Sequence, residues 1–261
     1  MVQKININHL AEELYKAEKT RMPVEPLTDR FSAVTLEEAY NVQLVNVNRR
    51  INQGERIIGK KIGLTSEAMQ RFLGVHEPDY GHIFNTMFLL KNELSMSQVI
   101  QPKAEGEIAF LMKEDIMGPG VTPLDVMRAT DYVIPAIEII DSRIKEWKIK
   151  IQDTVADNAS SAFILVGSRA LSLNEIDLLS TGMVFSKNGS IVATGASAAV
   201  MGNPVNAVTW LVNKLAEYNV SVKKGEIVLS GSITAAVDIK KGDVIDVTFD
   251  RLGPVRVKVL P

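Results

Sequence analysis

Three glutamates carry the chemistry that the sequence suggests first. Glu105 and Glu107 are two residues apart just before an apolar run, and side chains two apart on a strand point to the same side. Glu138 lies inside an apolar segment, where an acidic residue is rarely buried unless it is paired or binds a metal. The alternatives are a solvated strand face for the first two and a salt bridge from Glu138 to a basic residue such as Arg143.

Electrostatic repulsion favours a metal if the three carboxylates converge. Two carboxylates about 5 Å apart repel by roughly 3 kcal/mol at an effective dielectric constant near 20, so three such pairs sum to about 10 kcal/mol. That energy is comparable to the stability of a whole protein. The chain has no cysteine, and its three histidines lack metal-ligand spacing. Oxygen ligands alone predict Mg²⁺ or Mn²⁺ rather than Zn²⁺.

Three polar segments are candidates for the rest of a pocket. Residues 59–65 hold two adjacent lysines between glycines, so one lysine is expected to point inward and the other into solvent. Small and polar residues over 153–161 predict a tight loop with hydroxyl and amide donors, and glycine with hydroxyls over 229–234 ends a strand. Taken alone, each segment is more commonly an ordinary surface loop or turn.

The elements that position these residues begin with helices. Residues 9–21 place apolar side chains at helical spacing, and Thr35 with Glu38 forms a capping box for a second amphipathic helix that ends at Gly54. Further on, Asn188 and Gly189 indicate a hairpin turn. Strands are predicted over 108–112, 132–140, 162–166 and several segments between 226 and 259. Three more helices are predicted after 65–66, from Thr122-Pro123 and from Asn203-Pro204.

Strands and helices do not alternate regularly, which argues against a parallel α/β barrel and predicts an α+β fold. We expect an N-terminal helical segment over residues 1–55 and a β-rich catalytic body over 56–261. The net charge of -2 disfavours nucleic-acid binding. No apolar run approaches the roughly 20 residues that span a bilayer, and the first residues do not form a secretory signal. We therefore expect a soluble cytoplasmic protein without a membrane partner.

Four ordered motifs resemble those of one enzyme family. Residues 61–65, 74–81, 105–109 and 153–160 are similar to motifs of the 2-hydroxypenta-2,4-dienoate (2-keto-4-pentenoate) hydratases and the related 4-oxalocrotonate decarboxylases. Both groups belong to the fumarylacetoacetate hydrolase superfamily and act in aromatic meta-cleavage catabolism. The resemblance covers nearly the whole chain. It implies a β-rich body of the fumarylacetoacetase C-terminal type with an N-terminal helical segment.

The resemblance also implies roles for individual residues. The glutamates at 105, 107 and 138 become the metal ligands, and Lys61 and Asp79 become candidates for proton transfer and for orienting water. A lysine beside a bound cation loses proton affinity, which suits acid-base work near neutral pH. Gly106 stands where the family usually has alanine, and we expect no harm to the site. The expected substrate contacts are Thr65, Ser160 and Ser232.

The implied reaction is the addition of water to 2-hydroxypenta-2,4-dienoate, which gives 4-hydroxy-2-oxopentanoate. The alternative is decarboxylation of 2-oxo-3-hexenedioate (4-oxalocrotonate), because a metal-bound 2-oxo group serves both reactions. A third alternative is a non-catalytic protein stabilised by its metal. Relatives in this family imply a homo-oligomer, and hydratase and decarboxylase partners can associate, so a complex with a pathway partner enzyme is also implied.

Overall fold

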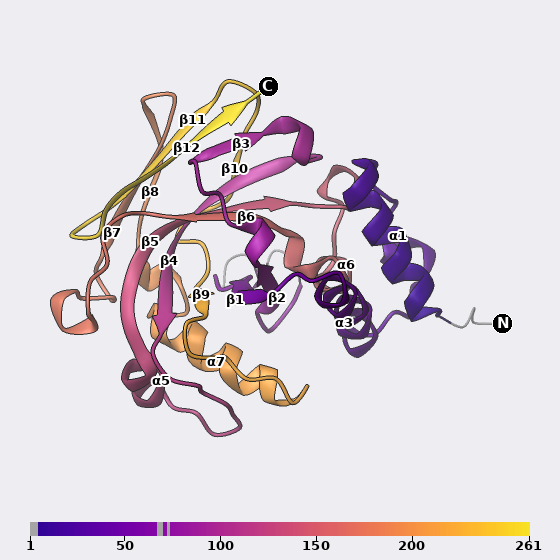
Figure 1. Cartoon of the computed structure of the whole chain (residues 1–261), viewed down its shortest axis with the longest axis horizontal. Coiled ribbons are helices and arrows are strands. Elements are labelled where there is room, and N and C mark those ends of the chain that lie inside the picture. Colours follow the sequence, from indigo (N-terminus) through magenta and orange to yellow (C-terminus); the bar gives the residue numbers. More distant parts are fainter. Residues whose placement is uncertain (1–4, 67–69, 72–73) are drawn as a thin grey trace.

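The N-terminal helices lie at one end of the molecule (Figure 1). The computed structural model describes residues 5–66, 70–71 and 74–261. The helices are α1 (Ile7–Thr20), α2 (Leu27–Arg30) and α3 (Leu36–Asn52). The predicted capping box is present, since the Thr35 side chain accepts from Glu38 N and the Glu38 carboxylate accepts from Thr35 N. Gly54 follows α3 with φ +91°, a conformation that glycine adopts easily.

A large, strongly curled sheet forms the body. Its path runs β2-β1-β9-β4-β5-β6, with β10 paired to β4, and only the β1–β9 pair in this sheet is parallel. Phe88, just after β2, bridges Ile164 of β6, so the two ends of the path meet. The strands are β1 (Ile57–Gly63), β2 (Asp79–Phe84), β4 (Pro102–Met112), β5 (Thr130–Asp141), β6 (Ser161–Val166), β9 (Ile227–Leu229) and β10 (Val237–Asp238).

A second sheet packs against β4. Gly106 faces this sheet, because a Cβ built there would lie 2.6 Å from Sδ of Met183 and 2.8 Å from Cγ1 of Val247. The predicted hairpin is confirmed, with positive φ at Asn188 and Gly189. The strand order is β3 (Glu93–Ser95), β12 (Gly253–Leu260), β11 (Val244–Phe249), β7 (Gly182–Lys187) and β8 (Ser190–Ala196).

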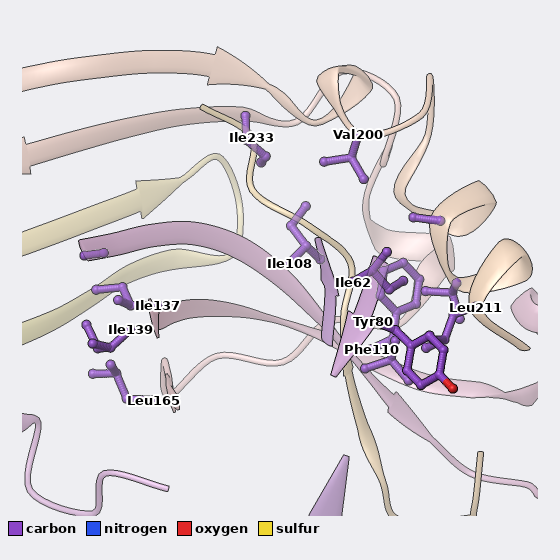
Figure 2. Close-up of a cluster of buried hydrophobic side chains, with 14 of the residues drawn as sticks. Ile62, Tyr80, Ile108, Phe110, Ile137, Ile139, Leu165, Val200, Leu211 and Ile233 are labelled. Carbon is purple, nitrogen blue, oxygen red and sulfur yellow. The ribbon is translucent and has the colours of Figure 1, made fainter. Parts of the chain in front are cut away.

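Helix α7 covers one face of the large sheet. Figure 2 shows Leu211 of α7 gathered with Ile62, Tyr80 and Phe110, which come from three strands. The helix begins at the predicted cap, Asn203, whose side chain accepts from Val205 N.

The remaining helices are α5 (Pro123–Ala129), α6 (Ile151–Ala156) and α7 (Pro204–Ala216). The 3-10 turns are η1 (Asn85–Met87), η2 (Met96–Gln98), η3 (Lys145–Trp147), η4 (Asn158–Ser160), η5 (Leu173–Glu175) and η6 (Ser197–Ala199).

The predicted α+β class and N-terminal helices are confirmed, and two local predictions are wrong. The tight loop expected over 153–161 begins as helix α6, because the Asp153 carboxylate accepts from the backbone N–H of Lys150 and caps the first turn. The apolar strand expected from residue 108 starts at 102, so Glu105 lies within it. The helix predicted after 65–66 falls largely on 67–69 and 72–73, outside the described residues. No described helix has the length and apolar character to cross a membrane.

Candidate metal centre and active site

Strand pairing brings the three predicted glutamates together. Glu105 lies directly opposite Glu138 in the β4–β5 register, and Glu107 lies two residues along on the same face. One carboxylate oxygen from each residue lies within 4.8 Å of the others. Glu107 and Glu138 are fully buried. The alternative of a solvated strand face is therefore wrong for Glu107, and Glu105 is half-buried.

The nearest basic side chain to Glu138 is not the one considered from sequence. Nζ of Lys61 lies 3.4 Å from Oε2 of Glu138. Arg143 instead pairs with Asp157, with 2.5 Å between its Nε and Oδ1 of Asp157. Arg143 is therefore the wrong partner, but the predicted alternative of a salt bridge from Glu138 to a basic residue is present, with Lys61 of β1.

Several carboxylate oxygens of the cluster accept no hydrogen bond from the described residues. Both carboxylate oxygens of Glu138 and Oε1 of Glu107 are buried with no hydrogen-bond partner among the described residues, although the Lys61 ammonium makes an ion pair with Oε2 of Glu138. Oε2 of Glu107 accepts from Gly231 N at 2.7 Å. Burying unpaired carboxylate oxygens costs several kcal/mol, and a coordinated cation removes that cost. The donor set of carboxylates only fits a hard divalent cation such as Mg²⁺.

The pKa values of the three glutamates reflect the same cost of burying negative charge. Burial raises the pKa of Glu105 to about 7, with the neighbouring Glu138 charge adding to the shift against the opposing effect of Lys61. Burial and repulsion from Glu138 and Glu105 raise the pKa of Glu107 well above its usual value. Burial also raises the pKa of Glu138, although the Lys61 ammonium opposes it. Protons and a metal ion therefore compete for the same oxygen atoms.

Strands β1 and β2 bring the predicted lysine and aspartate to this cluster. Lys61 and Asp79 are both buried, at 3% and 2% exposure. Gly63 pairs with Asp79, and a Cβ at Gly63 would overlap Oδ1 of Asp79 and lie 3.5 Å from Nζ of Lys61. The two side chains therefore end in the same small space, and the missing side chain of Gly63 keeps it open.

Lys61 carries its proton in the metal-free site. Burial alone would lower its pKa, but Glu138, Glu105 and Asp79 outweigh burial and raise the pKa above its usual value. The lowering expected from sequence depends on a cation that cancels part of this negative charge. Burial raises the pKa of Asp79, and the Lys61 ammonium partly offsets that shift.

The second lysine of the pair is not solvated, contrary to the sequence expectation. Lys60 points to the opposite face of β1, is 1% exposed, and places Nζ 2.8 Å from Oε2 of Glu226. An amphipathic pattern identifies the two faces of a strand, but it cannot identify a partner 166 residues away.

The three predicted substrate contacts lie in different surroundings. Thr65 is buried and packs against Gly231, whose backbone N–H donates a hydrogen bond to Glu107. Ser160 is buried and directly follows Ala159, whose carbonyl accepts from Lys61. The hydroxyl of Ser232 donates to Thr234 O at 2.7 Å, within its own loop. Their contact with substrate remains a prediction.

Sequence patterns missed one feature of the site, a left-handed turn in η4. Asn158, Ala159 and Ser160 have φ values of 55°, 51° and 53°. The turn places Ala159 O 3.0 Å from Nζ of Lys61. Asparagine at the first position was the one available signal, since asparagine tolerates the left-handed region better than other residues with a side chain.

Comparison with known proteins places most of this chain in one family. The fumarylacetoacetate (FAA) hydrolase C-terminal family matches residues 67–260. A 2-hydroxypent-2,4-dienoate hydratase of Pseudomonas putida is 50% identical over 222 residues, which cover 84% of this chain and 100% of the relative. A 2-hydroxyhexa-2,4-dienoate hydratase of Comamonas testosteroni is 42% identical, with 99% of both chains covered.

A solved structure extends the agreement to three dimensions. The 4-oxalocrotonate decarboxylase from Pseudomonas putida G7, complexed with magnesium and adipate, superposes with a TM-score of 0.95 and 38% identity. The match covers 99% of this chain and 100% of the decarboxylase. The chain belongs to the fumarylacetoacetate hydrolase family. The resemblance to its hydratases and decarboxylases, predicted from four motifs, is confirmed.

Proposed function

We propose that this protein is a divalent-metal-dependent hydratase that converts 2-hydroxypenta-2,4-dienoate and water to 4-hydroxy-2-oxopentanoate. The observation that carries the proposal is the converging trio of half-buried Glu105 and buried Glu107 and Glu138, with Lys61 beside it. The curated relatives described above support the hydratase reaction, since both are named as hydratases of 2-hydroxydienoates.

The chain's own residues divide the proposed work as follows. The three glutamates would hold Mg²⁺ or Mn²⁺, which supplies Lewis acidity toward the carboxylate and 2-oxygen of the substrate. Lys61, as an ammonium, would donate the proton that C5 of the dienol gains, and the proton lost by the 2-hydroxyl would return to Lys61. Asp79 would then accept a proton from the water whose oxygen adds at C4 of the resulting 2-oxo-3-enoate, and it would pass that proton to C3 to complete the product. Thr65, Ser160 and Ser232 are the proposed substrate contacts.

Decarboxylation of 2-oxo-3-hexenedioate is the second candidate. The solved decarboxylase that superposes over 99% of this chain favours it. The same carboxylates and lysine would serve, since loss of CO₂ leaves an enolate that also needs its oxygen stabilised. A purely structural metal is a weaker third candidate, because it gives no reason to bury Lys61 and Asp79 beside the ligands.

Product analysis by NMR tests the proposal. The metal-loaded protein is incubated separately with 2-hydroxypenta-2,4-dienoate and with 2-oxo-3-hexenedioate. We expect 4-hydroxy-2-oxopentanoate from the first substrate and no CO₂ from the second. Loss of CO₂ from the second alone would make the protein a decarboxylase. No reaction with either, in Mg²⁺ and in Mn²⁺, would contradict both reactions and favour the structural metal.

We further propose that the protein works in the cytoplasm as a homo-oligomer and associates with an enzyme of the same pathway. The absence of cysteine fits a reducing compartment. Sedimentation velocity, with and without the partner enzyme, tests the assembly, and a single monomeric species in both runs would contradict it.

A further inference from the structure

The left-handed turn of η4 carries an inference about the site. Asn158, Ala159 and Ser160 all have positive φ, and each residue with a Cβ pays an energetic cost there. Such conformations persist only where the surroundings impose them, and they gather at functional sites. The contacts that impose this turn therefore indicate what it is for.

The side chain of Asn158 clamps the turn to β2. Its Oδ1 accepts from His82 N at 2.8 Å, and its Nδ2 donates to His82 O at 2.9 Å. This pair imitates the bonds between neighbouring strands. A Cβ at Gly81 would overlap the Asn158 carbonyl, so the missing side chain at 81 lets the turn lie against the strand. Gly81 is the register partner of Lys61.

Arg143 fixes the residue that precedes the turn. Its Nε and its backbone N–H donate to the two carboxylate oxygens of Asp157, at 2.5 and 2.9 Å. The guanidinium also donates to the backbone carbonyls of Asp157, Asp141 and Ser161. Arg143 is 5% exposed and Asp157 is 3% exposed, so the turn is anchored in the core on one side and on β2 on the other.

We infer that Asn158 is a positioning residue for Lys61. The clamped turn holds Ala159 O 3.0 Å from Nζ of Lys61 and so keeps the ammonium 3.4 Å from Glu138. Lysine has a long flexible stem, and three carboxylates attract its ammonium strongly. Without the carbonyl, the ammonium would move among the carboxylates into the space of the cation. The kinetic consequence rests on the proposed hydratase activity.

Two variants distinguish the effect of losing the side-chain bonds to His82 from the effect of the left-handed backbone conformation at residue 158. Asn158→Ala removes both side-chain bonds to His82, and Asn158→Gly removes them while allowing the left-handed φ without cost. Asn188→Ala is the matched control, because Asn188 also has positive φ and also makes two side-chain bonds, to Asp243 and Val244, in the β7–β8 hairpin. Thermal melting identifies any variant that fails to fold. If an Asn158 variant fails, Gly81→Ala is used in its place, because its Cβ would displace the turn at the Asn158 carbonyl.

We expect both Asn158 variants to lower kcat by about ten- to a hundredfold, the usual consequence of misplacing a catalytic group by about 1 Å. KM should stay within about threefold of the wild-type value, and Asn188→Ala should leave kcat unchanged. A purely structural role of Asn158 would lower the melting temperature, but it would not lower kcat while leaving KM nearly unchanged. Wild-type kcat in either Asn158 variant, or an equal loss in Asn188→Ala, would overturn the inference.

A crystal structure of Asn158→Ala makes the test independent of the proposed reaction. We expect Nζ of Lys61 to leave Ala159 O and approach the carboxylates. An unchanged contact would overturn the inference whatever the kinetics. If the wild-type protein does not hydrate the dienoate, the proposed function fails, and this structure alone decides whether Asn158 positions the lysine.

Discussion

At the scale of single residues, Glu138 is the proposed metal ligand whose loss should matter most, since both of its oxygens are buried without a hydrogen-bond partner among the described residues and one of them is ion-paired with Lys61. Glu138→Gln keeps the shape and removes the charge. Changing a residue that merely supports a metal ligand typically costs 10–100-fold in affinity, so we expect a loss of about a hundredfold or more in Mg²⁺ affinity by isothermal titration calorimetry.

The matched control for this variant is Glu226→Gln, which removes another buried glutamate charge beside a lysine, Lys60, on the opposite face of β1. Its Mg²⁺ affinity should equal that of the wild-type protein. Equal affinities in all three proteins would mean that the cation binds elsewhere.

The raised pKa values of the glutamates predict an unusual pH dependence of stability. A glutamate in an unfolded chain has a pKa near 4.3, whereas burial raises the pKa of Glu105 to about 7 and raises those of Glu107 and Glu138. The folded metal-free protein therefore binds protons more tightly than the unfolded chain. These carboxyl groups destabilise the fold as pH rises from about 4.5 to 7.

Saturating Mg²⁺ should cancel this loss, because the cation takes the place of the protons. We expect the gain in melting temperature on adding Mg²⁺ to grow steadily between pH 5 and pH 8, as measured by differential scanning fluorimetry. Comparing each pH with and without Mg²⁺ removes the contribution of groups elsewhere. A gain that is the same at pH 5 and pH 8 would contradict the assignment of the ligands.

At the scale of elements, β4 shows why its two faces differ. Glu105 and Glu107 face the candidate site, and Gly106 between them faces the second sheet. Gly106→Ala would place its Cβ 2.6 Å from Sδ of Met183 and 2.8 Å from Cγ1 of Val247. Overpacking of this kind typically costs about 1–3 kcal/mol. Chemical denaturation should show that loss, with Mg²⁺ affinity unchanged.

Gly182→Ala is the control for this variant, since a Cβ at 182 meets nothing within 4 Å and lies on the strand that also carries Met183. The double variant Gly106→Ala, Met183→Ala should lose less stability than the sum of the two single losses, because the smaller residue at 183 removes part of the overlap. A Gly106→Ala protein as stable as the wild type would show that the two sheets separate easily at this point.

Elements were predicted well where local signals agree, and poorly where distant contacts decide. The capping box at Thr35 and the hairpin turn at Asn188 depend on neighbouring residues, so sequence sufficed. The sequence predicted that Glu105 and Glu138 come together if a metal binds there. It could not predict that they are direct register partners, since register depends on the whole sheet. Helix α6 was missed although Asp153 bonds locally to Lys150 N, because its N-cap residue, Lys150, is not a typical one, and the bonds that Asp153 accepts from Thr28, 125 residues away, leave no local trace.

At the scale of the whole molecule, Gln43 joins the N-terminal helices to the candidate site. This buried side chain of α3 donates from Nε2 to Tyr80 O of β2 at 2.9 Å and to Val155 O of α6 at 2.8 Å. Gln43→Ala leaves two buried carbonyls without this donor, which costs about 1–3 kcal/mol. We expect that loss in urea denaturation together with a lower kcat, because α6 leads into the turn that contacts Lys61.

Gln53→Ala is the comparison variant, since Gln53 follows the same helix and, among the described residues, its side chain bonds only to half-buried Tyr15. It should leave both stability and kcat close to the wild-type values. If Gln43→Ala lowers stability but not kcat, the N-terminal helices support the fold without shaping the active site.

The two adjacent lysines of β1 have a consequence for how the chain finds its fold. Strand β1 is buried on both faces from Gly59 to Ile62, so an alternating apolar pattern does not fix its register. Glu226 on one face and Glu138 on the other supply the distinction, because each accepts one lysine. A strand displaced by one position would bring one lysine to the place of the other and leave the second ammonium without its carboxylate. The ion pair behind the site, between Lys60 and Glu226, therefore favours the native register over a slipped strand that hydrophobic burial alone would tolerate.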